Sequence, residues 1–120
     1  AGQGTVGLEI ARQAAALDAA PDQVLVCCGG GGLVGGSAVA LRDALPAVQV
    51  HSVEPAGFDD TARSLATGTR VANSPEARSI CDALLAPTPG DLTFPLNRAL
   101  LAGGLVVDDD EVREAMRFAY

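Results

Sequence analysis

Four consecutive glycines, residues 29–32, constrain this chain more than any other feature of its sequence. The short apolar run before them, residues 24–28, is typical of a strand buried on both faces. The segment after them, as far as Leu45, has the apolar spacing of a helix. The glycines are therefore predicted to form a tight turn from a buried strand into a helix.

Such a turn is suited to holding an anion. Residues without a Cβ allow positive φ, and they let a ligand approach successive backbone N–H groups at the positive end of the following helix. The alternative is a purely structural turn, in which the helix simply packs close to its strand. One or two glycines would suffice for that, and four in a row lose more chain entropy than packing explains. We therefore favour a ligand-binding turn, with a phosphate as the expected anion.

The composition narrows the class of protein. The chain has 120 residues, enough for one domain, and 48% of them are hydrophobic, enough for a core. A formal net charge of -7 argues against a nucleic acid or an anionic membrane as partner, because either would need a basic surface. No apolar run is long enough to span a membrane, and no signal peptide opens the chain, so a cytoplasmic location is expected.

The reactive side chains are few. Cys27 and Cys28 are adjacent and Cys81 stands alone, so we expect buried thiols rather than a disulfide framework or a zinc site. The single histidine, His51, makes a zinc cluster still less favoured. All eight basic residues are arginines, so these 120 residues cannot form a Schiff base through a lysine amine.

The remaining pattern predicts an α/β fold. A helix with Thr5 as its N-cap comes first, and Pro46 ends the helix after the glycines. Strands are expected at residues 23–28, 49–54 and 105–107, and further helices at 60–66, 94–101 and 109–120. Gly103 and Gly104 are expected to stop a helix, and Asp108 with Glu111 to form a capping box. Residues 23–54 thus form a βαβ unit, which implies a parallel sheet.

The same glycines also satisfy a dinucleotide-binding pattern. Gly30, Gly32 and Gly35 have the spacing G-x-G-x-x-G, and Glu54 ends the next strand where an acid would bind a ribose hydroxyl. A nicotinamide- or flavin-dependent oxidoreductase is therefore an alternative. Against it, the glycine run begins one residue early, at Gly29, and a helix precedes the first strand.

Five blocks in order resemble one enzyme family. They are AGQGT at residues 1–5, CGGGGL at 28–33, VEP at 53–55, TPGDLTF at 88–94 and VDDDEV at 107–112. This pattern resembles the serine/threonine dehydratases and serine racemases, which depend on pyridoxal 5'-phosphate (PLP). The resemblance implies a parallel-sheet βαβ portion of the large domain of a tryptophan-synthase-β-like PLP enzyme.

The resemblance carries further expectations. It implies that Gly29, Gly30, Gly31, Gly32 and Leu33 bind the PLP phosphate. It also implies a homo-oligomer, specifically a dimer. The implied reaction is release of ammonia from a small amino-acid substrate, namely serine, threonine or a hydroxylated relative; the alternative reaction is racemisation of serine. In such enzymes the lysine that holds PLP lies upstream and the partner of the pyridine nitrogen downstream, so residues 1–120 are expected to be one partial domain, incomplete at both ends and inactive alone.

A metal site is also implied by the resemblance. In the family, an acid, a backbone carbonyl four residues on and an aspartate two beyond it can bind a divalent cation; here they are Glu54, Phe58 and Asp60. Such oxygen ligands suit Mg²⁺ or Ca²⁺. The alternative is that these are solvated carboxylates of an acidic chain.

A third hypothesis is a non-catalytic chain that binds a partner. An incomplete α/β domain exposes apolar faces of its strands and helices, and each Val or Leu left uncovered forgoes about 1.5–3 kcal/mol. Such a chain is expected to associate or to stay loosely packed.

Overall fold

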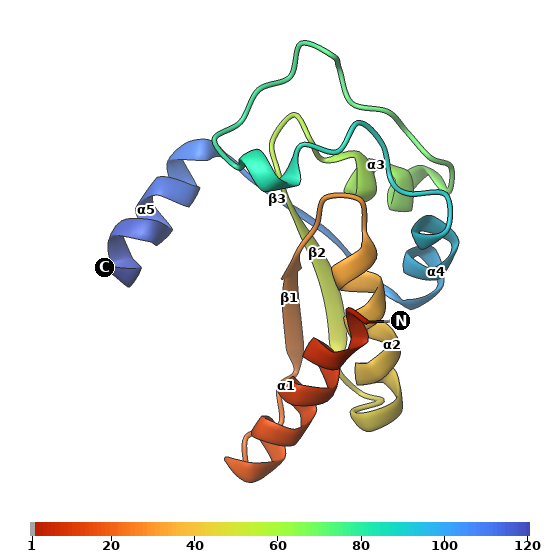
Figure 1. The fold of residues 1–120 in the computed structure, drawn as a ribbon, viewed down its shortest axis with the longest axis vertical. Helices are drawn as coiled ribbons and strands as arrows, with labels where there is room; N and C mark the ends of the chain where they lie inside the picture. The colour runs from red at the N-terminus through yellow and green to blue at the C-terminus, as the bar shows by residue number, and fades with distance from the viewer. Residues whose placement is uncertain (1) are drawn as a thin grey trace.

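The computed structural model describes residues 2–120 and contains one parallel sheet of three strands in the order β1-β2-β3. The strands are β1 (Gln23–Cys27), β2 (Gln49–Pro55) and β3 (Gly103–Val107). The helices are α1 (Gly4–Ala16), α2 (Gly32–Ala44), α3 (Asp60–Thr67), α4 (Thr93–Leu100) and α5 (Asp109–Ala119), with a 3₁₀ turn η1 (Asp82–Leu84). The predicted α/β class and the parallel βαβ unit are confirmed (Figure 1).

The register brings the carboxyl ends of the strands to one edge of the sheet. Val24 pairs with Val50 across β1 and β2, and Val53 pairs with Leu105 across β2 and β3. Because all three strands run in the same direction, the segments that follow Cys27, Pro55 and Val107 all leave from this edge. Open parallel sheets bind ligands at this edge.

Helices α1 and α2 cover one face of the sheet. The core there contains Val26, Val34, Ala38, Leu41 and Val50, of which Val34 and Leu41 are fully buried. Two glycines let α1 approach α2: a Cβ on Gly7 would lie 2.6 Å from the Ser37 carbonyl oxygen, and one on Gly36 would lie 2.8 Å from the Gly4 nitrogen. This close packing positions α2 beneath the glycine loop, defined here as residues 29–32.

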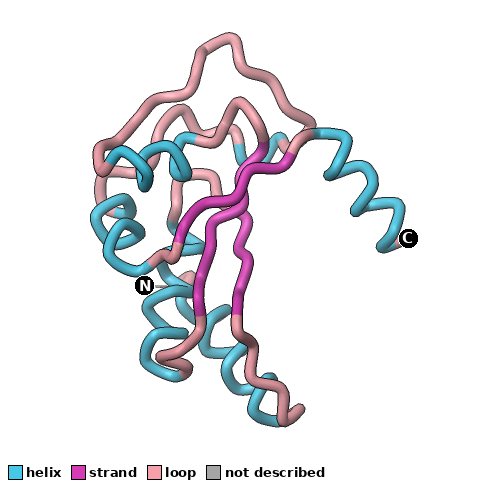
Figure 2. Tube along the Cα trace, turned by 180° about the vertical axis from the view of Figure 1, so that it is seen from behind, coloured by secondary structure: helices cyan, strands magenta, loops and turns pink. Residues whose placement is uncertain are grey.

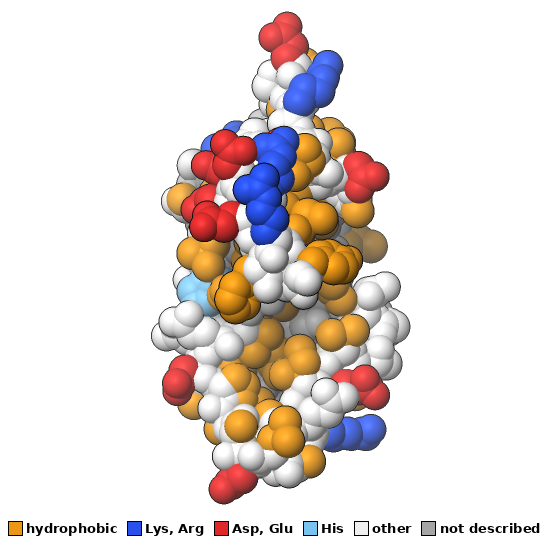
Figure 3. All heavy atoms as spheres, turned by 90° about the vertical axis from the view of Figure 1, so that its left-hand side faces the viewer, with side chains coloured by type: hydrophobic (Ala, Val, Ile, Leu, Met, Phe, Trp, Pro, Cys, Tyr) orange, Lys and Arg blue, Asp and Glu red, His pale blue; other side chains and the backbone are white. Residues whose placement is uncertain are grey.

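The opposite face of the sheet is open. The prediction that the first strand is buried on both faces is wrong, because among residues 2–120 helices pack on only one face of β1. Leu25 on the open face is 56% exposed, and Cys27 is exposed too. Figure 2 views the strands from this side, where no helix of the described chain covers them, and α5 projects to the right of the sheet. Hydrophobic side chains also gather on the face seen in Figure 3, beside the charged residues of α5.

Several predicted boundaries differ for local reasons. Thr5 is not an N-cap: helix α1 already includes Gly4, and the Thr5 hydroxyl donates to the Gly2 carbonyl at 2.9 Å. Gly103 and Gly104 lie inside β3 rather than ending a helix, because α3 packs directly on this strand. A Cβ on Gly104 would lie 2.6 Å from the Ala62 Cβ. The capping box of Asp108 and Glu111 is confirmed.

The helices of the described chain are short, and α1 and α2 have 13 residues each. Across residues 2–120, every helix is too short or too polar to span a bilayer.

Candidate functional site

The glycine loop lies at the carboxyl edge of the sheet, between the end of β1 and the start of α2. Gly30, Gly32 and Leu33 lie at the outer side of this turn, whereas Gly31 is buried and has φ of +84°. This left-handed conformation is one that glycine adopts without strain. The predicted strand-to-helix turn is thus present, with its outer side facing solvent.

The two central carbonyls of the loop face the protein. The Gly30 carbonyl accepts hydrogen bonds from the Thr93 hydroxyl at 2.6 Å and from the Gly90 amide at 3.3 Å. The Gly31 carbonyl accepts hydrogen bonds from Nδ2 of Asn97 at 3.2 Å and from the Gly35 amide, in α2, at 3.1 Å. The loop is therefore held to α4 by its carbonyl groups.

Unlike the carbonyls of the loop, its amides are not bonded to protein oxygens among residues 2–120. None of the five backbone N–H groups of residues 29–33 donates to an oxygen of the described chain. The Gly31 amide interacts with the Cys28 thiol, which leaves the amides of residues 29, 30, 32 and 33 without a protein partner among residues 2–120. Since α2 has 13 residues, its dipole adds to the positive potential at this end. The arrangement can bind an anion through backbone donors alone.

The two cysteines at the end of β1 have opposite environments. Cys28 is 1% exposed, and burial raises the pKa of its thiol to about 11, although the Thr61 hydroxyl at 3.4 Å acts in the other direction. Cys27 points to the open face and is exposed, so the prediction of a buried thiol is wrong for this residue. All three cysteines are free thiols.

Glu54 at the end of β2 caps a helix. Its side chain is fully buried, and its two carboxylate oxygens accept the amides of Thr61 at 2.9 Å and Ala62 at 2.7 Å, in the first turn of α3. Burial raises the pKa of this carboxyl group, and these hydrogen bonds partly offset the rise. A ribose hydroxyl could not reach a carboxylate enclosed in this way, so the geometry gives the dinucleotide alternative no support.

The other predicted metal ligands lie close to Glu54 along the chain. Phe58 is buried, and its amide donates to the Pro55 carbonyl at 2.9 Å. Asp60 is 1% exposed; its Oδ1 accepts from Nδ2 of Asn73, whereas its Oδ2 has no protein partner in the described chain. Burial raises the pKa of Asp60 as well. Within residues 2–120, no three His, Cys, Asp or Glu side chains converge on a common point as metal ligands.

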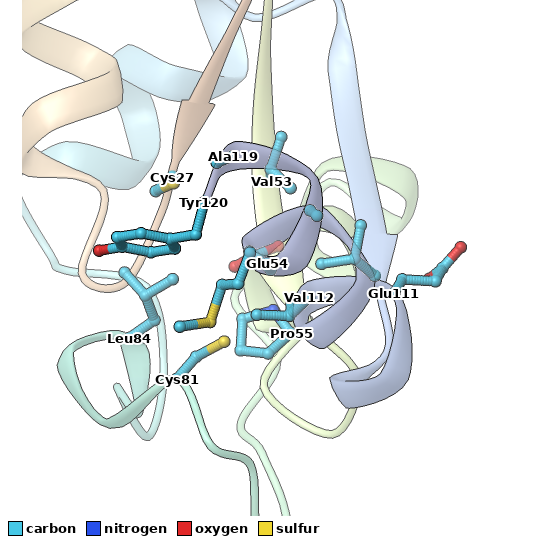
Figure 4. A pocket seen from close by; sticks show the side chains of 13 residues that line it. Cys27, Val53, Glu54, Pro55, Cys81, Leu84, Glu111, Val112, Ala119 and Tyr120 are labelled. Atoms are coloured by element: carbon cyan, nitrogen blue, oxygen red, sulfur yellow. The ribbon is translucent and has the colours of Figure 1, made fainter.

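An apolar cavity of about 560 Å³ opens on the uncovered side of the sheet (Figure 4). Its walls come from the carboxyl ends of the three strands, from η1 and from α5, and include Cys27, Val53, Cys81, Leu84, Val107 and Tyr120. The backbone of Leu84 also lies next to Gly29, 3.5 Å from where a Cβ on that glycine would be. The turn η1 therefore separates the cavity from the glycine loop.

Sequence reasoning missed the residues that hold the loop, Thr93 and Asn97. They lie four residues apart and thus on one face of α4. The available signal was this pair of polar residues in an otherwise largely apolar segment. Hydrogen bonds to carbonyls more than 60 positions earlier, however, could not be read from local spacing.

Comparison with known proteins places this chain among enzymes that depend on pyridoxal phosphate. The family model described as "Pyridoxal-phosphate dependent enzyme" matches residues 1–120. The chain is 38% identical to a serine racemase of Dictyostelium discoideum, covering 100% of this chain and 36% of that protein. It is 40% identical to a phenylserine dehydratase of Ralstonia pickettii, covering 99% of this chain and 35% of that protein.

The structural likeness is equally extensive. The crystal structure of a threonine deaminase from T.th. superimposes with a TM-score of 0.93 at 38% identity, covering 97% of this chain and 39% of that one. The structure of maize serine racemase superimposes with a TM-score of 0.89 at 39% identity, covering 99% of this chain and 36% of that one. The predicted fold, part of a tryptophan-synthase-β-like enzyme, is confirmed by this likeness. The chain spans about a third of the length of the curated relatives described here.

Proposed function

Because this chain belongs to the pyridoxal-phosphate dependent enzyme family, we propose that its glycine loop and Leu33 bind the phosphate of PLP. The observation that carries the proposal is the division of the loop into carbonyls bonded to α4 and amides without an oxygen partner among residues 2–120. Each hydrogen bond from an amide to a charged group contributes about 1.5–3 kcal/mol. Three such bonds would hold a phosphate without a basic side chain.

We further propose that the chain is part of an ammonia-lyase acting on serine, threonine or a related hydroxy amino acid. The names of its relatives, a phenylserine dehydratase and a threonine deaminase among them, support this reaction class. Serine racemases are equally similar in sequence, so serine racemisation is the second candidate. Both reactions begin with proton loss at the substrate Cα, and the glycine loop serves both alike.

The chain's own contribution is binding and orientation. The chemistry that PLP supplies when bound is an electron sink for the electron pair left at Cα. The glycine loop would hold the phosphate end and so fix the position of the ring. Because these 120 residues contain no lysine, we propose that the amine that carries PLP comes from other residues of the enzyme.

Binding of PLP to the chain tests the first proposal directly. Titration with PLP, followed by amide chemical shifts, should move the resonances of Gly29, Gly30, Gly32 and Leu33, and inorganic phosphate should move the same resonances. A Cβ on Gly32 meets no protein atom within 4 Å, so a Gly32→Ala variant should fold normally. The same variant should bind PLP more weakly. Shifts confined to other parts of the chain would refute phosphate binding by this loop.

Turnover tests the second proposal. We expect no steady formation of 2-oxo acid from serine or threonine by the 120 residues with added PLP. We expect turnover by the protein that carries the missing amine. Steady turnover by the lysine-free chain would contradict the assignment of roles.

We also propose a divalent cation site at Glu54, Asp60 and the carbonyl of Phe58. The unpaired and buried Oδ2 of Asp60 supports it, because a buried carboxylate oxygen without a partner is costly. Calorimetric titration with Mg²⁺ should show binding that a Glu54→Gln, Asp60→Asn double variant loses. Asp59→Asn is the matched control, since Asp59 instead pairs with Arg63 at 3.1 Å and should leave binding intact. Equal heats for all three proteins would refute the site.

A further inference from the structure

Two polar side chains on α4 reach across to the glycine loop. Thr93 donates to the Gly30 carbonyl at 2.6 Å, and Asn97 donates to the Gly31 carbonyl at 3.2 Å. The two residues are one helical turn apart, so they bond consecutive peptide groups of the loop. This contact joins segments separated by more than 60 residues in the chain.

Bonding a carbonyl also fixes an amide. In a planar trans peptide, the C=O of one residue and the N–H of the next point in opposite directions. Asn97 and the Gly35 amide, which donates at 3.1 Å, both bond the Gly31 carbonyl, so the Gly32 amide must point in the opposite direction. In the same way, Thr93 fixes the peptide that carries the Gly31 amide, which interacts with the Cys28 thiol. Glycine peptides would otherwise rotate easily, because no side chain restricts them.

The environment of the Asn97 side chain is not the one expected of a residue that serves packing alone. Its side chain is fully buried, yet its Oδ1 has no partner in the described chain. An aliphatic side chain of similar size would fill the same space without leaving a buried oxygen unsatisfied. The contact with Gly31 is the one hydrogen bond that this side chain makes among residues 2–120.

The surrounding glycines accommodate this asparagine. A Cβ on Gly31 would lie 2.5 Å from Nδ2 of Asn97, and a Cβ on Gly35 would lie 2.5 Å from its Oδ1. The amide group of Asn97 therefore lies between the loop and the first turns of α2. Only glycine at positions 31 and 35 leaves room for it there.

We propose that Asn97 is a positioning residue that aims the Gly32 amide at the phosphate, and that Thr93 supports it by fixing the preceding peptide. The inference rests on the proposed binding of PLP by the glycine loop. It assigns a role in cofactor affinity to a buried side chain that does not itself touch the cofactor. Its effect should concern the phosphate and not the rest of the PLP molecule.

The test compares PLP with pyridoxal, which lacks the phosphate, as ligands of the full-length apoprotein. Asn97→Leu removes the donor and keeps the branched shape of the side chain, so PLP should bind about tenfold more weakly while pyridoxal binding is unchanged. The midpoint of thermal unfolding should stay equal or rise, because the unpaired Oδ1 is gone. A residue that served packing alone would instead change stability and the binding of both ligands together.

Thr93 provides a second, independent pair of variants. Thr93→Val removes the hydroxyl at nearly constant volume and should weaken PLP binding by a few fold, whereas Thr93→Ser keeps the donor and should restore it. If Asn97→Leu does not fold, this pair decides: equal PLP affinity of the Val and Ser variants overturns the inference.

The outcomes separate the two proposals. A wild-type protein that binds PLP no better than pyridoxal overturns phosphate binding by the loop, and the role of Asn97 with it. A wild-type protein that prefers PLP, together with an Asn97→Leu variant that keeps this preference, overturns only the role of Asn97. Selective loss of PLP affinity with unchanged stability supports it.

Discussion

The glycine loop and helix α5 leave the same edge of the sheet, yet they differ in how completely the described chain supports them. The loop is held by α4 and lies above a core in which Val34 and Leu41 are fully buried. Helix α5 has no buried residue among those described; Met116 is 53% exposed and Phe118 is 95% exposed. In Figure 1 this helix projects away from the sheet.

The difference shows which part of the molecule is structurally self-sufficient. The loop requires only α2, α4 and the residues before α4, all of which are present and packed. The open face of the sheet exposes Leu25 and Leu105, on the side where the apolar cavity opens. Contiguous apolar surface of this kind is typical of an interface. The expectation that apolar faces are left exposed is thus confirmed for this side only.

The two cysteines at the end of β1 give the largest expected contrast between the covered and the open face. Burial raises the pKa of Cys28 to about 11, so at pH 8 only about one thiol in a thousand is the reactive thiolate. Cys27 is exposed. We expect iodoacetamide to modify Cys27 at least roughly a hundredfold faster than Cys28, as measured by peptide mass spectrometry. Similar rates would mean that the covered face opens readily in solution.

Gly31→Ala should disrupt the supported region most strongly. The variant combines a φ of +84° with a contact of 2.5 Å between the new Cβ and Asn97, so we expect a loss of about 2–4 kcal/mol in the free energy of unfolding. Gly32→Ala is the control, because its Cβ meets open space and its effect should stay within about 0.5 kcal/mol. Urea unfolding measures both, and equal values would contradict the described loop conformation.

Two acidic helix caps compare the regions directly. Glu54→Ala removes a buried acceptor of two amides at the start of α3, and we expect it to cost about 2–3 kcal/mol. Asp108→Ala removes the N-cap of α5, and we expect about 0.5–1 kcal/mol, because this helix packs little against the described chain. Chemical unfolding of both variants checks the order. A larger loss for Asp108→Ala would show that α5 is essential to the folded state.

The smallest effect concerns the contact between α5 and the segment before η1. Asp109 accepts from the Ser79 hydroxyl at 2.6 Å, and this bond lowers the pKa of its carboxyl below the ordinary 3.8. The contribution of a group with a lowered pKa is present above its ordinary pKa and is lost as the pH falls through the lowered value. We expect the Ile80 amide, which also donates to Asp109, to lose hydrogen-exchange protection only below about pH 3.8. Loss at higher pH would contradict the contact, and Asp110→Ala should leave the profile unchanged.

The sequence predicted the parallel sheet and most elements to within one or two residues, because periodicity and capping are local. The apolar run of β1 could not reveal that its second face is open, since that depends on which helices pack there. For Gly103 and Gly104, the sequence could not distinguish a helix stop from a strand on which α3 packs closely. The binding of PLP by the glycine loop and the cation site remain predictions.

Four glycines between a strand and a helix determined on their own that this chain has a tight turn at the positive end of a helix, because conformational freedom and the helix dipole follow from local sequence. Only the tertiary structure decided which way those amides point. The Gly30 and Gly31 carbonyls are bonded by Thr93 and Asn97, more than 60 residues away, and we propose that these bonds help to set the direction of the amides. Hydrogen bonds between distant segments leave no periodic signal in a sequence, so they are visible only once the chain is folded.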